Sequence, residues 1–178
     1  RVASRGLGDV YKRQSQSFPM EIIRKMGELG FMGIMVDPKY GGSGMDTISY
    51  VLIIEELSKI DASASVIVSV NNSLVCYGLE TYGTEDQKQK YLTKLATGEH
   101  IGAFCLSEPE AGSDATSQQT TAIEKEDHYV INGTKNWITN GGIADVYLVV
   151  AQTDRNKGHK GCLLYTSDAA GEVRGVDL

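Results

Sequence analysis

The hydrophobic pattern of this chain changes its period near residue 100. Before that point, segments such as FPMEIIRKMGELG place apolar residues three or four positions apart, which is the spacing of one face of an α-helix. After it, the short runs IGAFCL, DHYVI and DVYLVVAQ are rich in aromatic and β-branched residues, which favours strands. The sequence therefore predicts an α+β protein: an all-α domain over residues 17–100, then an antiparallel β domain over residues 101–161 that stops after a few strands.

Turn and cap residues divide the helical half into segments. Pro19 suits the first turn of the first helix and Gly30 its end. The stretch ASASVIVSVNNSLVCYGLETYG is small and apolar almost all round, which predicts a buried central helix. Thr84 and Gln87 have the spacing of a capping box, and Gly98 is expected to end the helix that follows.

Two glycine turns punctuate the β half. Asn132-Gly133 has the composition of a two-residue hairpin turn, and Asn140-Gly141-Gly142 that of a second turn. Both are expected to join strands.

Composition limits the classes of function. The formal net charge of -6 argues against non-specific binding to nucleic acid, because no basic stripe is present to displace counterions. The three cysteines, Cys76, Cys105 and Cys162, are widely spaced and form no CxxC pair, which is typical of free thiols in a reducing compartment. The three histidines are scattered without the spacing of metal ligands, so we expect no metal site.

No segment of the sequence resembles a signal peptide or a transmembrane helix. The N-terminal residues carry charge but no apolar core of a signal peptide, and no apolar run approaches the roughly 20 residues that span a bilayer. We therefore expect a cytoplasmic protein that does not enter the membrane.

The two ends of the chain differ from the rest. Residues 1–16 are rich in arginine and have no apolar face, and residues 162–178 begin as a strand and then become small and charged. One interpretation is frayed termini. The other is that both ends are translated non-native sequence.

The stretch FCLSEPEAGSD, which begins at Phe104, admits three interpretations. Glu108 and Glu110 could be a pair of acid catalysts, but Pro109 between them favours a turn that points them apart. The small residues Ala111–Ser113 could cradle an anion with main-chain N–H groups and a hydroxyl. The third interpretation is an ordinary solvated turn.

The stretch KNWITNGG, which begins at Lys135, contains the single tryptophan of the chain, Trp137. The ring could fill the core between a sheet and helices. It could instead form a wall against a planar aromatic cofactor, with the Thr139 hydroxyl bonding to a ring atom. By contrast, the GGSG loop at Gly41–Gly44 lacks the spacing of a phosphate loop and is expected to be structural.

Together, FCLSEPEAGSDATS and YVINGTKNWITNGGIADVYLVVAQTD resemble the acyl-CoA dehydrogenase family, and closest among its members the short-chain, butyryl-CoA-type bacterial ones. The resemblance covers about Phe18 to Gly161. It implies an N-terminal helical domain followed by an incomplete β-barrel-like middle domain. The family's C-terminal four-helix domain, with its glutamate base, lies outside this chain, so no catalytic residue is assigned here.

The resemblance also implies a site for FAD. Main-chain groups near Leu106 and the Ser107 hydroxyl would contact the pyrimidine edge of the flavin, and Thr139 would lie near N5. Ser113 would lie where the FAD pyrophosphate and the acyl-CoA chain approach each other, and Val70 and Leu74 would form the floor of the acyl pocket. The implied cofactor-binding residues are Phe104, Cys105, Leu106, Ser107, Ser113, Trp137, Ile138 and Thr139.

The activity that the resemblance implies is the dehydrogenation of a short-chain acyl-CoA to the trans-2-enoyl-CoA. Electrons would pass to an electron-transferring flavoprotein, and the complete enzyme would be a homo-tetramer; this fragment alone would be inactive. Two alternatives remain open at this point: an acyl-CoA oxidase that uses oxygen, and a non-catalytic module that binds flavin or acyl-CoA.

Overall fold

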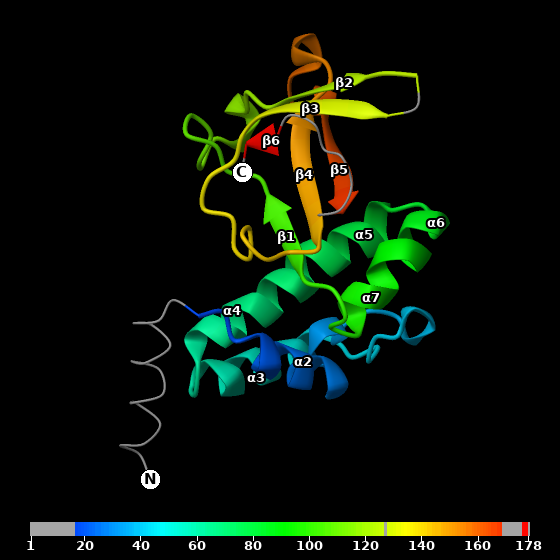
Figure 1. The fold of residues 1–178 in the computed structure, drawn as a ribbon, viewed down its shortest axis with the longest axis vertical. Coiled ribbons are helices and arrows are strands. Elements are labelled where there is room, and N and C mark those ends of the chain that lie inside the picture. The colour runs from blue at the N-terminus through cyan, green and yellow to red at the C-terminus, as the bar shows by residue number, and fades with distance from the viewer. Residues whose placement is uncertain (1–16, 127, 169–175, 178) are drawn as a thin grey trace. The chain divides into compact units, whose positions relative to one another are not determined.

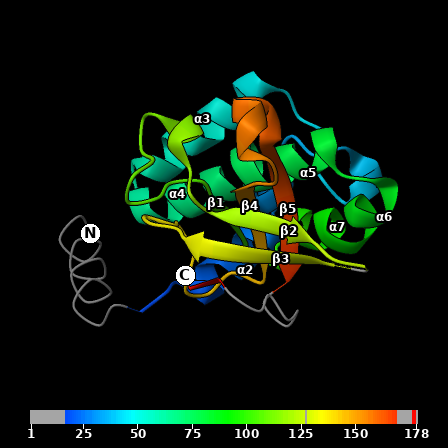
Figure 2. The same cartoon turned by 90° about the horizontal axis from the view of Figure 1, so that it is seen from above.

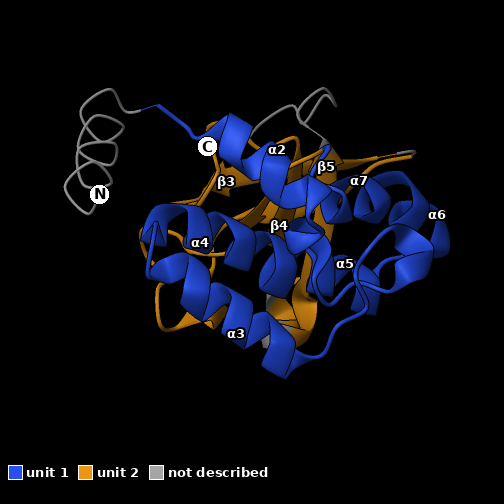
Figure 3. Cartoon of the chain, turned by 90° about the horizontal axis from the view of Figure 1, so that it is seen from below, with its two compact units in different colours: residues 1–99 blue, residues 100–178 orange. Residues whose placement is uncertain are grey.

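The computed structural model describes residues 17–126, 128–168 and 176–177, and the chain divides into two compact units (Figure 3). Residues 1–99 form unit 1 and residues 100–178 form unit 2. The boundary coincides with the change of hydrophobic period, and the predicted α+β order of helices and then sheet is confirmed. Of the two end segments that the sequence sets apart, residues 1–16, 169–175 and 178 lie outside the described residues.

Unit 1 consists of helices joined by short turns (Figure 1). Its elements are α2 (Met20–Glu28), η1 (Phe31–Gly33), η2 (Pro38–Tyr40), α3 (Thr47–Ser58), α4 (Ala62–Val70), η3 (Asn71–Cys76), α5 (Tyr77–Tyr82), α6 (Glu85–Gln87), η4 (Lys88–Leu92) and α7 (Thr93–Ala96).

The helix boundaries of unit 1 follow the local signals in the sequence. The predicted capping box is confirmed: the Thr84 hydroxyl accepts from the Gln87 N–H, and the Gln87 side chain accepts from the Thr84 N–H. Gly30 and Gly98 follow the ends of α2 and α7 with φ of 79° and 74°, a left-handed conformation that glycine adopts without steric cost. Pro19 precedes α2 as its N-cap.

The segments α4, η3 and α5 form one continuous helix, Ala62–Tyr82. The turn Asn71–Cys76 is π-helical, which widens the helix locally. The predicted burial holds for one face only. Ile67, Val68, Val75, Cys76 and Leu79 are buried, whereas Val66, Leu74 and Tyr77 on the same helix are exposed.

Two buried asparagines of this helix bond to the main chain of distant segments. The Asn71 amide donates to the carbonyl oxygens of Met32 (2.8 Å) and Leu95 (3.1 Å). The Asn72 side chain accepts from the Ile34 N–H (2.7 Å) and donates to the Phe31 carbonyl (2.8 Å). These bonds pair buried main-chain groups of distant segments, and they fix the turn η1 against the central helix.

By length and composition alone, the helix Ala62–Tyr82 could cross a membrane, whereas the sequence led us to expect no such segment. The difference arises because a mean hydropathy over 18 residues tolerates Asn71 and Asn72, which interrupt the apolar run. Of that window, 56% is buried inside the structure. A core helix passes the same test, so the result is weak evidence for a span.

Unit 2 is a curled sheet whose strands follow the order β1-β4-β2-β3-β6, with β5 on the other side of β4 (Figures 1 and 2). Its elements are β1 (Gly102–Cys105), η5 (Ala115–Ser117), β2 (Thr121–Glu124), β3 (Tyr129–Thr134), β4 (Val146–Gln152), η6 (Arg155–Gly161), β5 (Cys162–Asp168) and β6 (Val176–Asp177). The expected strand at the start of the segment 162–178 is therefore present as β5.

The sheet is mixed, not wholly antiparallel as the sequence analysis expected. β2 pairs antiparallel with β3, and β4 with β5. However, β1 pairs parallel with β4, with Gly102 opposite Val146. Parallel neighbours need a long crossover, and here residues 106–145 provide it. That crossover contains all of KNWITNGG and, from Leu106 on, the segment FCLSEPEAGSD.

The predicted hairpin turn at Asn132-Gly133 is wrong. Asn132 lies within β3, opposite Thr121 of β2, and the turn closes instead where the Lys125 N–H bonds to the His128 carbonyl. A side chain at Gly133 would clash with Thr120, so this glycine is needed for the close approach of two chain segments. The predicted turn at Asn140-Gly141-Gly142 is confirmed, and Asn140 has a left-handed φ of 67°.

Candidate functional site

The two motif segments meet immediately after β1 and β3. Leu106 and Ser107 follow β1, and Lys135 and Asn136 follow β3. The Asn136 N–H donates to the Ser107 carbonyl (2.8 Å), and the Lys135 ammonium donates to the Leu106 carbonyl (3.1 Å). Stretches that are almost thirty residues apart in the sequence therefore form one local structure.

A buried ion pair lies beneath this junction. Lys135 Nζ is 2.7 Å from Glu108 Oε1, and the two side chains are 0% and 3% exposed. The ammonium also donates to Gln118 Oε1 (2.9 Å). Together with the bond to the Leu106 carbonyl, this satisfies all three N–H donors of the lysine.

The Glu108 carboxylate is equally well satisfied. It accepts from the Gln119 N–H (2.6 Å) and the Thr120 N–H (3.2 Å) in addition to Lys135. Burial opposes its ionisation, but the hydrogen bonds from Lys135, Thr120 and Gln119 outweigh that effect and hold the pKa of the carboxyl below its ordinary value. Glu108 is therefore an ionised structural partner of Lys135.

The segment Ser107–Ala111 (SEPEA) forms a tight turn in which Glu108 and Ala111 are buried. Glu108 and Ala111 exchange two main-chain hydrogen bonds of 3.0 and 3.2 Å. Pro109 and Glu110 project outward and are exposed. A glutamate pair acting on one substrate is therefore excluded, as the position of Pro109 suggested. Asp114 is also structural, because it caps η5 by accepting from the Thr116 N–H.

Trp137 is the most unusual residue of the junction. Its side chain is 93% exposed, so the interpretation of this ring as a core filler is wrong. Its φ of 60° is left-handed, which is uncommon and costly for a large side chain and concentrates at functional sites.

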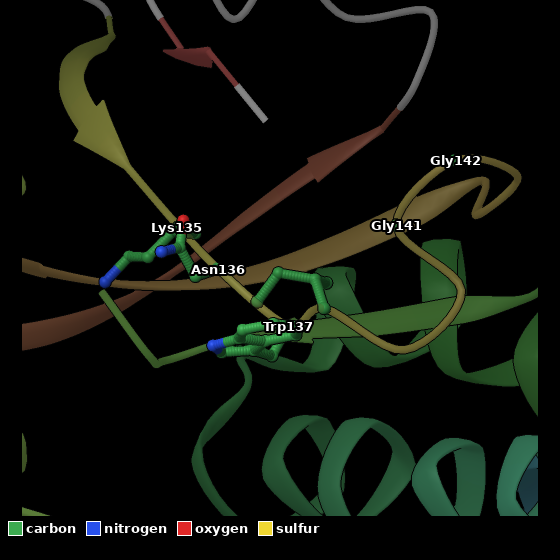
Figure 4. Close-up of a pocket in the computed structure, with 6 residues that line it drawn as sticks. Lys135, Asn136, Trp137, Gly141 and Gly142 are labelled. Carbon is green, nitrogen blue, oxygen red and sulfur yellow. The ribbon is translucent and has the colours of Figure 1, made fainter. Parts of the chain in front are cut away.

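The exposed ring lies beside a pocket. Lys135, Asn136, Trp137, Ile138, Gly141 and Gly142 line a volume of about 490 Å³ (Figure 4). All of these residues belong to the loop between β3 and β4. A side chain added at Gly142 would meet no atom within 4 Å, so the pocket is open on that side.

Three hydroxyl groups of the predicted site have no hydrogen-bond partner among the residues that the structure describes: those of Ser107, Ser113 and Thr139. Ser107 and Thr139 are half-buried, and Ser113 is exposed. A Cβ at Gly112 would meet no atom within 4 Å, so the turn that carries Ser113 faces open space. These groups can therefore donate to, or accept from, a bound molecule.

The remaining predicted site residues are less accessible. Phe104 and Ile138 are half-buried, and Ile138 packs against the small core of the sheet. The Cys105 side chain is completely buried in that core, and burial raises the pKa of its thiol to about 11, against a smaller opposing effect from Lys135. Any contact that Cys105 makes with a cofactor therefore goes through its main chain.

Val70 and Leu74 belong to unit 1. Val70 is half-buried and Leu74 is 40% exposed, on the helix that also exposes Val66 and Tyr77. The two residues form part of an apolar stripe, which is a surface that could receive an acyl chain.

The Glu108–Lys135 pair with its partner Gln118 was not predicted from the sequence. The one signal for it was a glutamate and a lysine that each lie within three residues of the end of a strand, in different motifs. Among the described residues, no group of three or more His, Cys, Asp or Glu side chains is placed to hold a metal ion.

Comparison with protein families gives two matches that together cover most of the chain. The family model for the acyl-CoA dehydrogenase N-terminal domain matches residues 7–99. The model for the acyl-CoA dehydrogenase middle domain matches residues 103–176. The first match begins before Phe18 and the second ends after Gly161, which were the limits of the resemblance in the sequence.

Individual relatives agree with these matches. The short-chain-specific acyl-CoA dehydrogenase of Clostridium acetobutylicum is 52% identical over 148 residues, which are 83% of this chain and 39% of that protein. The structure of butyryl-CoA dehydrogenase from Megasphaera elsdenii is 44% identical with a TM-score of 0.79, over 84% of this chain and 40% of that one.

Two further structures widen the comparison. A chain in the structure titled for the electron transferring flavoprotein of Acidaminococcus fermentans is 46% identical, with a TM-score of 0.85 over 88% of this chain and 41% of that one. Glutaryl-CoA dehydrogenase from Mycobacterium smegmatis, in complex with FADH2, is 36% identical, with a TM-score of 0.82 over 89% of this chain and 40% of that one.

This chain spans about two fifths of the length of the relatives it matches. Within that span the family models cover both compact units, and the motif segments form one junction around an exposed tryptophan and a pocket. The chain belongs to the acyl-CoA dehydrogenase family.

Proposed function

We propose that this chain is the N-terminal and middle part of a flavin-dependent dehydrogenase of short-chain acyl-CoA thioesters. The product is the trans-2-enoyl-CoA. The observation that carries the proposal is the junction in unit 2, where an exposed Trp137 with left-handed backbone lies beside a pocket of about 490 Å³.

The residues of the junction fit FAD. A flavin is a planar ring with polar groups along one edge, so its site needs an aromatic or apolar face and a few hydrogen-bonding groups. Trp137 and Ile138 offer such a face. The hydroxyls of Ser107 and Thr139, which have no partner in the described part of the chain, and the main chain at Leu106 offer polar contacts at its edge. The family's use of FAD, and the FADH2 complex of one structural relative, agree with this assignment.

The division of roles follows the predicted site. The main chain of Phe104, Cys105 and Leu106 and the Ser107 hydroxyl hold the pyrimidine edge. Thr139 holds the edge near N5. The exposed Ser113 turn, which faces open space, binds near the pyrophosphate and the acyl-CoA chain. When bound, FAD supplies the acceptor for the hydride that leaves the β-carbon.

The acyl group occupies a surface of the helical unit. Val70 and Leu74 lie on the exposed apolar face of the central helix, and burying such a face against an acyl chain is favourable by roughly 25 cal/mol for each Å² of apolar surface. We propose these two residues as the floor of the acyl pocket.

The base that removes the α-proton is not among the residues assigned here. Glu108 is committed to Lys135, and Glu110 is exposed on the outer side of its turn. In keeping with the family, we propose that a glutamate of the C-terminal four-helix domain is the base, that the complete enzyme is a cytoplasmic homo-tetramer, and that an electron-transferring flavoprotein accepts its electrons. The structural relative from Acidaminococcus fermentans supports that choice of partner.

An anaerobic titration tests the proposal. The complete protein that carries this chain is loaded with FAD and mixed with butyryl-CoA without oxygen. We expect the flavin absorbance to bleach and to recover on addition of oxidised electron-transferring flavoprotein. Absence of bleaching with any acyl-CoA would contradict the proposed activity, and rapid recovery in air alone would indicate an oxidase.

A further inference from the structure

The buried pair Glu108–Lys135 lies directly behind the two segments assigned to the cofactor. Lys135 immediately precedes Asn136 and Trp137, which line the pocket, and Glu108 immediately follows Ser107. Each residue of the ion pair is therefore a direct neighbour in sequence of one of the two segments that form the site. The Lys135 side chain is completely buried and that of Glu108 is 3% exposed.

The pair is also bonded to the main chain of the opposite segment. Lys135 donates to the Leu106 carbonyl, and one residue further along the Asn136 N–H donates to the Ser107 carbonyl. Two consecutive residues of one wall therefore hold two consecutive residues of the other. This arrangement sets the separation between the Leu106–Ser107 main chain and the Trp137–Thr139 loop.

The loop needs such an anchor. Trp137 is left-handed, with a φ of 60°, and Asn140 is left-handed, with a φ of 67°. The tryptophan side chain is almost fully exposed, so its own packing supplies little energy to hold this conformation. A strained segment persists only where its surroundings hold it in place, and the buried, fully hydrogen-bonded Lys135 lies two residues before Trp137.

We propose that Glu108 and Lys135 are positioning residues for the cofactor site: the buried ion pair fixes the distance and register between the two segments that bind opposite parts of the flavin. This inference rests on the proposed function. Glu108 is not among the residues that line the pocket, and it acts on the ligand through the main chain of Leu106, Ser107 and Asn136. Replacing Glu108 therefore alters the fit of the site without changing any residue that lines it.

Three variants of the complete protein test the inference. Glu108→Gln keeps the shape of the side chain but leaves the lysine without its counter-charge. Glu108→Asp keeps the charge but draws the carboxylate back from Lys135. Lys59→Met is the matched control, because Lys59 Nζ is also 2.7 Å from a carboxylate oxygen, that of Glu56, but both side chains are more than half exposed.

The first readout is the affinity for FAD, measured by fluorescence titration well below the unfolding temperature of each variant. When supporting residues are displaced, a site loses affinity for its ligand even though the residues that contact the ligand are unchanged. We expect about tenfold weaker binding for Glu108→Gln, about threefold for Glu108→Asp, and less than twofold for Lys59→Met. The visible circular dichroism of bound FAD should change in both Glu108 variants and not in the control.

The second readout needs no cofactor. Hydrogen exchange of the Asn136 amide, which bonds to the Ser107 carbonyl, should speed up in the Glu108 variants while amides of unit 1 keep their rates. If Glu108→Gln does not fold at any assay temperature, Glu108→Asp decides the question. FAD affinity within twofold of the unsubstituted protein and unchanged exchange at Asn136 in the folded Glu108 variants would overturn the inference and leave the proposed function intact. No binding of FAD by the unsubstituted protein would overturn both.

Discussion

Each unit of this protein contains a buried polar network, and the two networks are built from different chemistry. In unit 1, the neutral amides of Asn71 and Asn72 bond to main-chain groups of distant segments. In unit 2, the charged Glu108 and Lys135 bond to each other and to main-chain groups on either side. Burying neutral amides costs far less than burying charges.

The difference corresponds to what each network holds. The asparagines fix the turn η1 against a helix, which is a task of packing. The ion pair holds two loops that carry the predicted cofactor contacts, where the backbone is strained and where directional bonds matter more than apolar burial. Buried charges contribute little net stability. We therefore infer that this pair is present because it fixes the geometry of the two loops.

The largest expected effect comes from removing one charge of unit 2. Lys135→Met leaves the Glu108 carboxylate buried without a cation, which should destabilise unit 2 by about 3–5 kcal/mol. Urea unfolding followed by hydrogen exchange at amides of each unit measures this loss separately. Lys59→Met, at an exposed pair of the same length, should cost less than about 1 kcal/mol. Equal losses in the two variants would contradict the assigned difference in burial.

A smaller loss of stability is expected when the asparagine network of unit 1 is broken. Asn72→Ala leaves the Ile34 N–H buried without an acceptor, because the bond of 2.7 Å from that group to the asparagine is removed. The cost should be about 1–3 kcal/mol, confined to unit 1. The same unfolding experiment measures it, and a loss that spreads to unit 2 would show that the two networks are coupled.

The two buried networks should differ in their response to pH, because only the one in unit 2 contains a carboxyl group with a shifted pKa. The pKa of Glu108 is lowered in the folded state, so its stabilisation is fully present above the ordinary pKa of an unfolded glutamate and is lost as pH falls through the lower, folded pKa. Acidification from neutral pH should therefore weaken unit 2 through this group, whereas the Asn71 and Asn72 contacts carry no titrating group. In Glu108→Gln this acid-dependent contribution should disappear, and its persistence there would assign it to another group.

Breaking the capping box should lower stability locally, by the amount that is usual for the loss of an N-cap side chain. Thr84→Ala removes the acceptor for the Gln87 N–H at the start of α6, and should cost about 1 kcal/mol. Thr84→Ser, which keeps the hydroxyl, is the matched control and should stay close to the unsubstituted chain. Thermal unfolding followed by far-ultraviolet circular dichroism measures both variants.

The smallest effect on stability should come from the residue closest to the predicted chemistry. Trp137→Ala removes a side chain that is 93% exposed, so the free energy of unfolding without FAD should change by less than about 0.5 kcal/mol. In the presence of FAD, the stabilisation that the cofactor gives to the unsubstituted protein should be reduced. A large loss without FAD would indicate that the ring packs against the protein after all.

The parts of the fold that were predicted correctly depend on neighbours in sequence. The capping box at Thr84 needs only residues three apart, and the ends of the helices at Gly30 and Gly98 need only a left-handed residue. The acid-catalyst interpretation of Glu108 and Glu110 could also be set aside locally, because Pro109 separates them.

The parts that were wrong or missed depend on contacts between distant segments. Asn132-Gly133 has a turn composition, but the approach of Thr120 needs glycine inside a strand. The parallel pairing of β1 and β4 is set by a crossover of forty residues, and the partners Glu108 and Lys135 lie 27 positions apart. A local pattern carries no information on either pairing. The exposure of Trp137 is likewise a property of the folded loop.

The position of Trp137 has a consequence for how this protein can be observed. It is the single tryptophan in the chain, and it projects from the pocket loop, not from a core (Figure 4). Its emission should already resemble that of a solvated indole in the native state and should change little on unfolding. A flavin that stacks against the ring would accept its excitation energy and quench it. The fluorescence of Trp137 is therefore a poor measure of folding, but it would report directly whether the site is occupied.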